Sequence, residues 1–203
     1  MVQLFLDGGG FMIPILLIFI IGLAFVIERL YHLIKGLKSD ETFAEEIANT
    51  VKSSGIDSAK SLCEDAQGPV ANLCLAALDR ANLGPEEAEH ALDHSGSIEM
   101  ASMEKNMTWI SLCIATAPML GFLGTVWGMI QAFNDIKMAN DISPAVVAGG
   151  ISVALLTTAF GLVVAVILQI FQNAVMYIID NQIVTLQKST IALLHAIKDS
   201  SKS

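Results

Sequence analysis

Charge is what this 203-residue sequence has least of, since only 15% of its residues are charged, against roughly 25% in soluble domains. The shortage is concentrated in three runs without any charged residue, at positions 8–27, 106–134 and 142–179. About 20 apolar residues in a helix cross the hydrocarbon core of a bilayer. The sequence therefore predicts an all-α integral membrane protein with three transmembrane helices.

Cysteine and basic residues are also scarce, and each shortage excludes a class of function. The three cysteines form no CxxC pair, which argues against disulfides and zinc. We interpret Cys63, Cys74 and Cys113 as small hydrophobic residues, with Cys113 in lipid. A net charge of −9 argues against nucleic-acid binding. Because no nucleophile–base pair, metal motif or phosphate loop lies in or beside a span, we expect neither enzyme activity nor a cofactor.

The positions of Lys and Arg predict the topology. Basic residues follow the first run, precede the second and follow the third, and none precedes the first. The positive-inside rule then places the N-terminus outside and the C-terminus in the cytoplasm. The first run lacks the basic region and cleavage site of a signal peptide, so we expect an uncleaved helix. The predicted parts are a first transmembrane helix with a periplasmic N-terminus (1–34), a cytoplasmic helical loop (35–105), a second transmembrane helix (106–134), a short periplasmic link (135–143), a third transmembrane helix extending into the cytoplasm (144–179) and a cytoplasmic helical tail (180–203).

The polar segment between the first two spans is rich in helix-forming patterns. Residues 40–52 carry an apolar stripe and end at a Ser-Ser-Gly break, residues 70–81 form a second helix, and Gly84-Pro85 begins a third. We expect Gly96 to interrupt that third helix. Glu86, His90 and His94 share one face at a spacing that could bind a metal, but surface helices carry such spacings by chance, so no metal site is predicted.

The tail after the third span carries one apolar stripe, formed by Ile183, Leu186, Leu193, Leu194 and Ile197. A three-helix membrane domain offers this stripe no partner surface. We therefore predict that the tails of several copies pack together in a cytoplasmic bundle.

Small residues repeat at helical spacing in the second and third spans. The third span has Gly150, Ala154, Thr158, Gly161 and Ala165 at steps of 4, 4, 3 and 4. In lipid such a face lets helix backbones approach closely, and Thr157 and Thr158 could in addition line a polar path. Thr hydroxyls can also bond a carbonyl one turn back, so both interpretations stay open. The second span has the same kind of face, with a proline expected to kink its helix, and its residues are Ala117, Pro118, Gly121, Gly124, Thr125 and Gly128.

These two spans carry a family resemblance. The segment from Ala117-Pro118 to Gly128 resembles the AP-LG-LGTVWG signature of the ExbB/TolQ/MotA membrane-motor family, and GISVALLTTAFG, ending at Gly161, resembles the last membrane helix of that family. Three spans resemble the ExbB/TolQ branch. The resemblance implies a homopentamer in the bacterial inner membrane around two copies of a single-span ExbD/TolR-like partner, which carries the essential Asp. It also implies that ion flow is converted to mechanical work at the periplasm.

The resemblance also implies roles for individual residues. Thr125 and Thr158 match the threonines that face the pore of the family. Val153 stands where ExbB and TolQ usually have Glu, whereas stator-type relatives tend to have an apolar residue and a Thr-Thr pair, as in Thr157-Thr158. This departure leaves both H⁺ and Na⁺ open as the transported ion.

The uncharged runs limit what the chain can do alone. A proton relay through hydrocarbon needs an ionisable group, and these spans contain none. Thr can position water or coordinate Na⁺ but does not store a proton near neutral pH. The carboxylate must then come from another chain, which predicts a channel-forming housing. The alternative is a membrane scaffold that packs helices without conducting ions.

Overall fold

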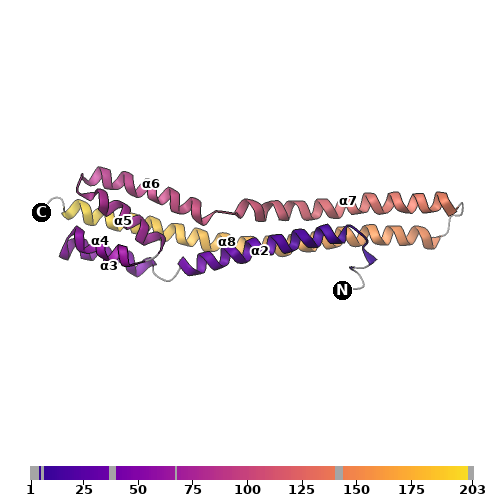
Figure 1. The fold of residues 1–203 in the computed structure, drawn as a ribbon, viewed down its shortest axis with the longest axis horizontal. Helices are drawn as coiled ribbons and strands as arrows, with labels where there is room; N and C mark the ends of the chain where they lie inside the picture. The colour runs from indigo at the N-terminus through magenta and orange to yellow at the C-terminus, as the bar shows by residue number, and fades with distance from the viewer. Residues whose placement is uncertain (1–4, 6, 37–39, 67, 140–143, 201–203) are drawn as a thin grey trace. The chain divides into compact units, whose positions relative to one another are not determined.

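The computed structural model describes residues 5, 7–36, 40–66, 68–139 and 144–200, and within these ranges it contains helices and no strands (Figure 1). The all-α prediction is therefore confirmed for the described part of the chain. The labelled helices are α2 (Met12–Gly36), α3 (Asp40–Ser54), α4 (Ile56–Asp65), α5 (Pro69–Ala81), α6 (Pro85–Met103), α7 (Met107–Ala139) and α8 (Pro144–Ser200).

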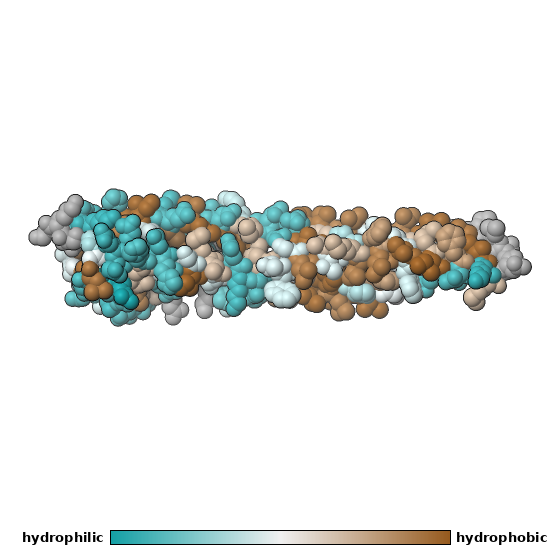
Figure 2. All heavy atoms as spheres, turned by 90° about the horizontal axis from the view of Figure 1, so that it is seen from above, coloured by the Kyte–Doolittle hydropathy of each residue, from teal (hydrophilic) through white to brown (hydrophobic). Residues whose placement is uncertain are grey.

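The helices form two compact units. The first, here called the transmembrane unit, consists of Met1–Glu28 and Asn106–Val175. The second, called the polar unit, consists of Arg29–Lys105 and Met176–Ser203. Figure 2 shows hydrophobic side chains gathered over the helices of the transmembrane unit and hydrophilic ones over α3 to α6.

Among the described helices, three are long and apolar enough to cross a membrane. They are Met12–Ile34, a stretch of Pro85–Met138 and a stretch of Val147–Asp199. Much of their surface is apolar and exposed in the single chain, as at Met119 and Phe122, each 68% exposed. Such a surface is stable in lipid or against other membrane helices, so the chain is a multi-pass membrane protein.

The core of the transmembrane unit lies where α2, α7 and α8 meet. Ile15, Cys113, Ala117, Val164 and Leu168 are all buried there. Cys113 is 7% exposed and therefore contacts neighbouring helices, which corrects its expected position in lipid. A small residue is needed at this crossing because bulkier side chains would separate the helices.

The structure differs from the sequence expectations at two helix positions. Helix α7 continues past residue 134, the predicted end of the second span, through the polar residues to Ala139. No Gly or Pro lies between Asp135 and Ala139, so nothing in the backbone ends the helix there. Residues 140–143 of the expected periplasmic link lie outside the described residues. Gly96 does not interrupt α6, which runs unbroken from Pro85 to Met103.

The polar unit buries the apolar stripe of the tail. Leu186, Leu193 and Ile197 are each at most 4% exposed in the single chain. The sequence analysis expected other copies to cover this stripe, and that expectation is wrong for these residues. The partner surface belongs to the polar unit, in which the tail lies in one compact unit with Arg29–Lys105 and ion pairs join Lys198 to Glu89 and Asp199 to Lys52.

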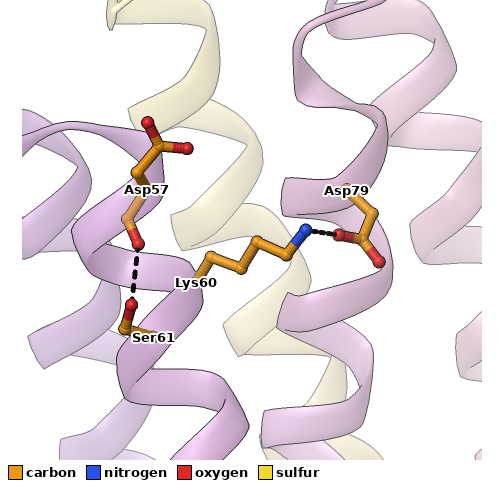
Figure 3. Close-up of polar contacts among 4 residues, drawn as sticks. All are labelled: Asp57, Lys60, Ser61 and Asp79. Carbon is orange, nitrogen blue, oxygen red and sulfur yellow. Dashed lines mark hydrogen bonds and ion pairs between the residues drawn. The ribbon is translucent and has the colours of Figure 1, made fainter.

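The four helices α3 to α6 pack as a bundle, with α5 against α6 and α4 against both α3 and α5. Helix α4 was not predicted, although Gly55, with φ of 87°, separates it from α3 as expected. Lys60 of α4 reaches Asp79 of α5 in an exposed ion pair (Figure 3). The hydrogen bond that Lys60 donates to Asp79 raises the pKa of Lys60.

The thiols of Cys63 and Cys74 are buried between α4 and α5 and hydrogen-bond one another. This bond and burial raise the pKa of Cys74, while the bond lowers the pKa of Cys63. Both cysteines are free, as the sequence analysis expected.

Candidate functional site

The small-residue faces of α7 and α8 lie directly against each other in the transmembrane unit, and we call this contact the glycine seam. A Cβ added to Gly124 would lie 2.6 Å from Thr157 Oγ1, and one added to Gly121 would lie 2.9 Å from the Thr157 carbonyl oxygen. A Cβ added to Gly161 would lie 2.6 Å from the Ala117 carbonyl oxygen. These distances are too short for any side chain, so the two backbones touch because glycine is present.

The remaining small residues extend the same contact toward the end of α7. A Cβ added to Gly128 would lie 3.2 Å from the Cβ of Ala154. Ala154 is itself 3% exposed. Five of the six predicted packing residues therefore belong to the glycine seam: Gly121, Gly124, Gly128, Ala154 and Gly161. The sixth, Pro118, flanks it, because it follows Ala117 within α7.

The structure separates the two adjacent threonines of α8. Thr157 is 1% exposed, and its hydroxyl donates a 2.7 Å hydrogen bond to the carbonyl of Ala154. It fills the space beside Gly124, so in the single chain α7 covers it. Thr158 is only partly buried, and its hydroxyl donates across the seam to the carbonyl of Gly121 at 3.1 Å.

Thr125 lies on α7 outside the seam. Its hydroxyl donates a 2.6 Å hydrogen bond to the carbonyl of Phe122, one turn back on the same helix. In both Thr125 and Thr158 the hydroxyl proton is thus used within the protein, and the oxygen lone pairs stay available as acceptors. These oxygens can accept from water or bind a cation, which is the chemistry that a path for ions requires.

A cavity of about 390 Å³ opens beside the seam where α2 begins. It is lined by glycines 8 to 10 of the chain, by Trp127 and Gln131 of α7, and by Val153 and Thr157 of α8. Val153 therefore places an apolar side chain at a cavity wall, where a carboxylate would have added charge. Among the described residues, no group of three His, Cys, Asp or Glu side chains is arranged to hold a metal ion.

The sequence analysis did not single out a cluster of amide side chains in the transmembrane unit, which lies on α8 beyond the glycine seam, toward residue 175. Gln169 of α8 donates hydrogen bonds to Gln172 and Asn173, and Gln172 Nε2 donates to Ser111 Oγ of α7 at 2.5 Å. The sequence does carry a signal for this cluster, because three amide side chains fall among the five residues 169–173, inside an uncharged apolar run.

Comparison with known proteins agrees with this picture of a membrane helix assembly. Residues 65–188 match the MotA/TolQ/ExbB proton channel family. An ExbB-like biopolymer transport protein of Synechocystis, ExbB-like 3, is 27% identical over 90% of this chain and 88% of its own length. A second Synechocystis relative, ExbB-like 1, is 31% identical over 80% of this chain, and an ExbB homolog of Methanothermobacter thermautotrophicus is 30% identical over 89%. The chain spans about two thirds of these last two relatives, 65% and 64% of their lengths.

Proposed function

Because the chain belongs to the MotA/TolQ/ExbB proton channel family, we propose that it is the channel-forming subunit of a motor driven by the ion-motive force. Several copies, five in the proposed assembly, surround a single-span ExbD/TolR-like partner that carries the intramembrane Asp. The N-terminus is periplasmic and the C-terminus cytoplasmic, in the bacterial inner membrane, and the mechanical work is delivered at the periplasm.

Two features together support this function most directly: threonine oxygens that can still accept hydrogen bonds, and membrane spans that carry no charge. Thr125 and Thr158 both direct their hydroxyl protons to backbone carbonyls and keep acceptor lone pairs. No charged residue lies in the runs 8–27, 106–134 and 142–179. A transported cation can therefore be coordinated or hydrated at this level, but its countercharge has to come from the partner.

Thr157 has a different part in this proposal. Its hydroxyl is covered by α7, so it supports the seam that holds Thr158 in place. Thr157 also borders the cavity beside α2, so a direct role in coordinating Na⁺ would use the cavity side of this residue and not the seam.

The experiment compares ion flux in proteoliposomes that contain this chain alone with flux in liposomes that also contain its single-span, Asp-bearing partner. We expect negligible gradient-driven flux from the chain alone and selective flux from the complex. Substantial selective flux without a partner would contradict the housing role, and an assembled complex that never conducts would favour a non-conducting scaffold.

Variants of the threonines then test the path. Thr158→Val removes the hydroxyl at nearly constant volume, and we expect flux through the complex to fall while Thr158→Ser retains it. Thr116→Val is the matched control, because the hydroxyl of Thr116 bonds only one turn back on α7, to the carbonyl of Leu112. Measuring each variant with Na⁺ and pH varied separately identifies the ion.

A further inference from the structure

The amide cluster of α8 has no role in the function proposed so far, although polar side chains are costly at membrane depth. Gln169 Nε2 donates to Asn173 Oδ1 at 3.1 Å and to Gln172 Oε1 at 3.4 Å, and Gln172 donates to Ser111 on α7. Gln169 and Asn173 are exposed on the surface of the single chain. Polar residues in membrane helices generally face the bundle interior or a water-filled space.

Aromatic side chains indicate the depth of this cluster. Trp109 stacks on Phe25 at one end of the transmembrane unit, and Trp127 contacts Phe11 at the other. Tryptophans are enriched at membrane interfaces, and the 18 helical steps from Trp109 to Trp127 correspond to roughly 27 Å of helix. Ser111 follows Trp109 by two residues, so its partner Gln172 lies just inside that interface and Gln169 lies about one turn deeper.

The amides also share a face with the proposed ion path. Gln169 follows Thr158 by 11 residues, which turns the helix by three revolutions and about 20° more. The two side chains therefore point the same way from α8, roughly 16 Å apart along its axis. Ala165 lies between them on this face and is buried in the single chain.

We propose that Gln169 and Gln172, held by Asn173 and Ser111, form a polar collar that continues the ion path from Thr158 toward the cytoplasm. The carbonyl oxygens of these amides bind the water and the monovalent cation that leave the threonine level. Ser111 fixes the collar by tying α8 to α7 at this depth. This inference rests on the proposed function, because a collar has a use only where ions pass.

The first test measures gradient-driven flux through the complex of this chain and its single-span partner in proteoliposomes. We expect Gln169→Leu to lower flux about tenfold, the loss that removing one hydrogen-bonding partner of a charged group produces. Gln169→Asn should retain most of the flux because it keeps the amide. Gln187→Leu is the matched control, since Gln187 is an exposed glutamine of α8 five turns beyond Gln169, on the same face but in the polar unit.

The second test measures water contact and does not depend on conduction. In the assembled complex, Gln169→Cys should react with a small charged thiol reagent much faster than Ile170→Cys, its neighbour on a different face. The native cysteines are buried and provide the baseline. Equal reactivity of the two cysteine variants would overturn the collar, and so would unchanged flux in Gln169→Leu. The collar is also wrong if Gln169→Leu fails to assemble and Gln169→Asn restores assembly, because the amides would then only pack helices.

The threonine variant separates this inference from the function on which it rests. If Thr158→Val lowers flux and Gln169→Leu does not, the collar is wrong and the channel stands. If the wild-type complex conducts nothing, the proposed function itself fails.

Discussion

The two units of the chain differ in the side chains at their helix contacts. The α7–α8 seam of the transmembrane unit is made of glycine, alanine and Thr157, and many large apolar side chains of that unit, such as Met119 and Phe122, are exposed, although Ile15 and Leu168 are buried. The polar unit buries large side chains at its contacts, among them Leu73, Leu78 and Leu92 at 1% exposure or less. The difference follows from the solvent: water drives Leu inward, whereas lipid gives helices no hydrophobic reason to associate and leaves close packing as the main attraction.

The largest expected effect comes from filling the glycine seam. In Gly124→Leu the new Cβ would lie 2.6 Å from Thr157 Oγ1 and 2.8 Å from Thr157 Cβ, with three more carbons to place. The helices would have to separate, at a cost above the roughly 1–3 kcal/mol of ordinary overpacking. We expect loss of the monodisperse folded species in mild detergent, measured by size-exclusion chromatography.

Gly149→Leu is the control for this experiment, because a Cβ at Gly149 meets nothing within 4 Å. Both changes add the same side chain to a transmembrane helix, and only one adds it to the seam. A folded Gly124→Leu protein that matches Gly149→Leu would show that the seam is not closely packed.

In the polar unit the damaging change is the reverse one, from large to small. Leu73→Ala should destabilise this unit by about 2–5 kcal/mol, because it leaves a cavity at a fully buried position. Leu83→Ala removes the same atoms from a side chain that is 64% exposed, and we expect little change. Thermal unfolding followed by circular dichroism measures both, and equal shifts would mean that Leu73 is not part of a closely packed core.

Periodicity was enough to predict the apolar helices and the small faces. The three uncharged runs and the steps of three and four residues between small side chains are local properties of the sequence. What periodicity lacks is the partner of each face. The stripe of Leu186, Leu193 and Ile197 is visible in the sequence, but its burial against helices far away in the chain is not.

The two threonines show the same limit at the candidate site. Thr157 and Thr158 are neighbours in sequence, yet one is covered by Gly124 and the other reaches Gly121. The different surroundings of the two threonines depend on the exact position of α7 against α8, which the sequence pattern does not give. Gly96 failed as a predicted break for a related reason, since glycine lowers helix propensity by only about 1 kcal/mol and tertiary packing exceeds that.

Glycine should therefore respond differently in the two units. A Cβ at Gly96 would lie 3.6 Å from Leu73 Cδ1, an ordinary contact, within a helix that favours alanine. Gly96→Ala should stabilise the polar unit by about 0.5–1 kcal/mol, measured as a higher unfolding temperature. Gly84→Ala is the matched control, since a φ of 125° strains any side chain and should lower that temperature. Destabilisation by Gly96→Ala would place Gly96 in a contact as tight as the seam.

The smallest effect concerns the exposed ion pair between Lys60 and Asp79 (Figure 3). Their side chains are 39% and 48% exposed, so water and salt screen the attraction, and exposed pairs contribute little to folding. The pKa of Lys60 is raised by the hydrogen bond that it donates to Asp79, so the folded state holds the proton more tightly than the unfolded state does. The contribution is therefore fully present below the ordinary lysine pKa of 10.5 and is lost as pH rises through the raised value. We expect the unfolding temperatures of Lys60→Gln and the wild type to differ little at neutral pH and to converge at strongly alkaline pH. A large difference at neutral pH that persists in high salt would show that this pair, unlike other exposed pairs, holds α4 against α5.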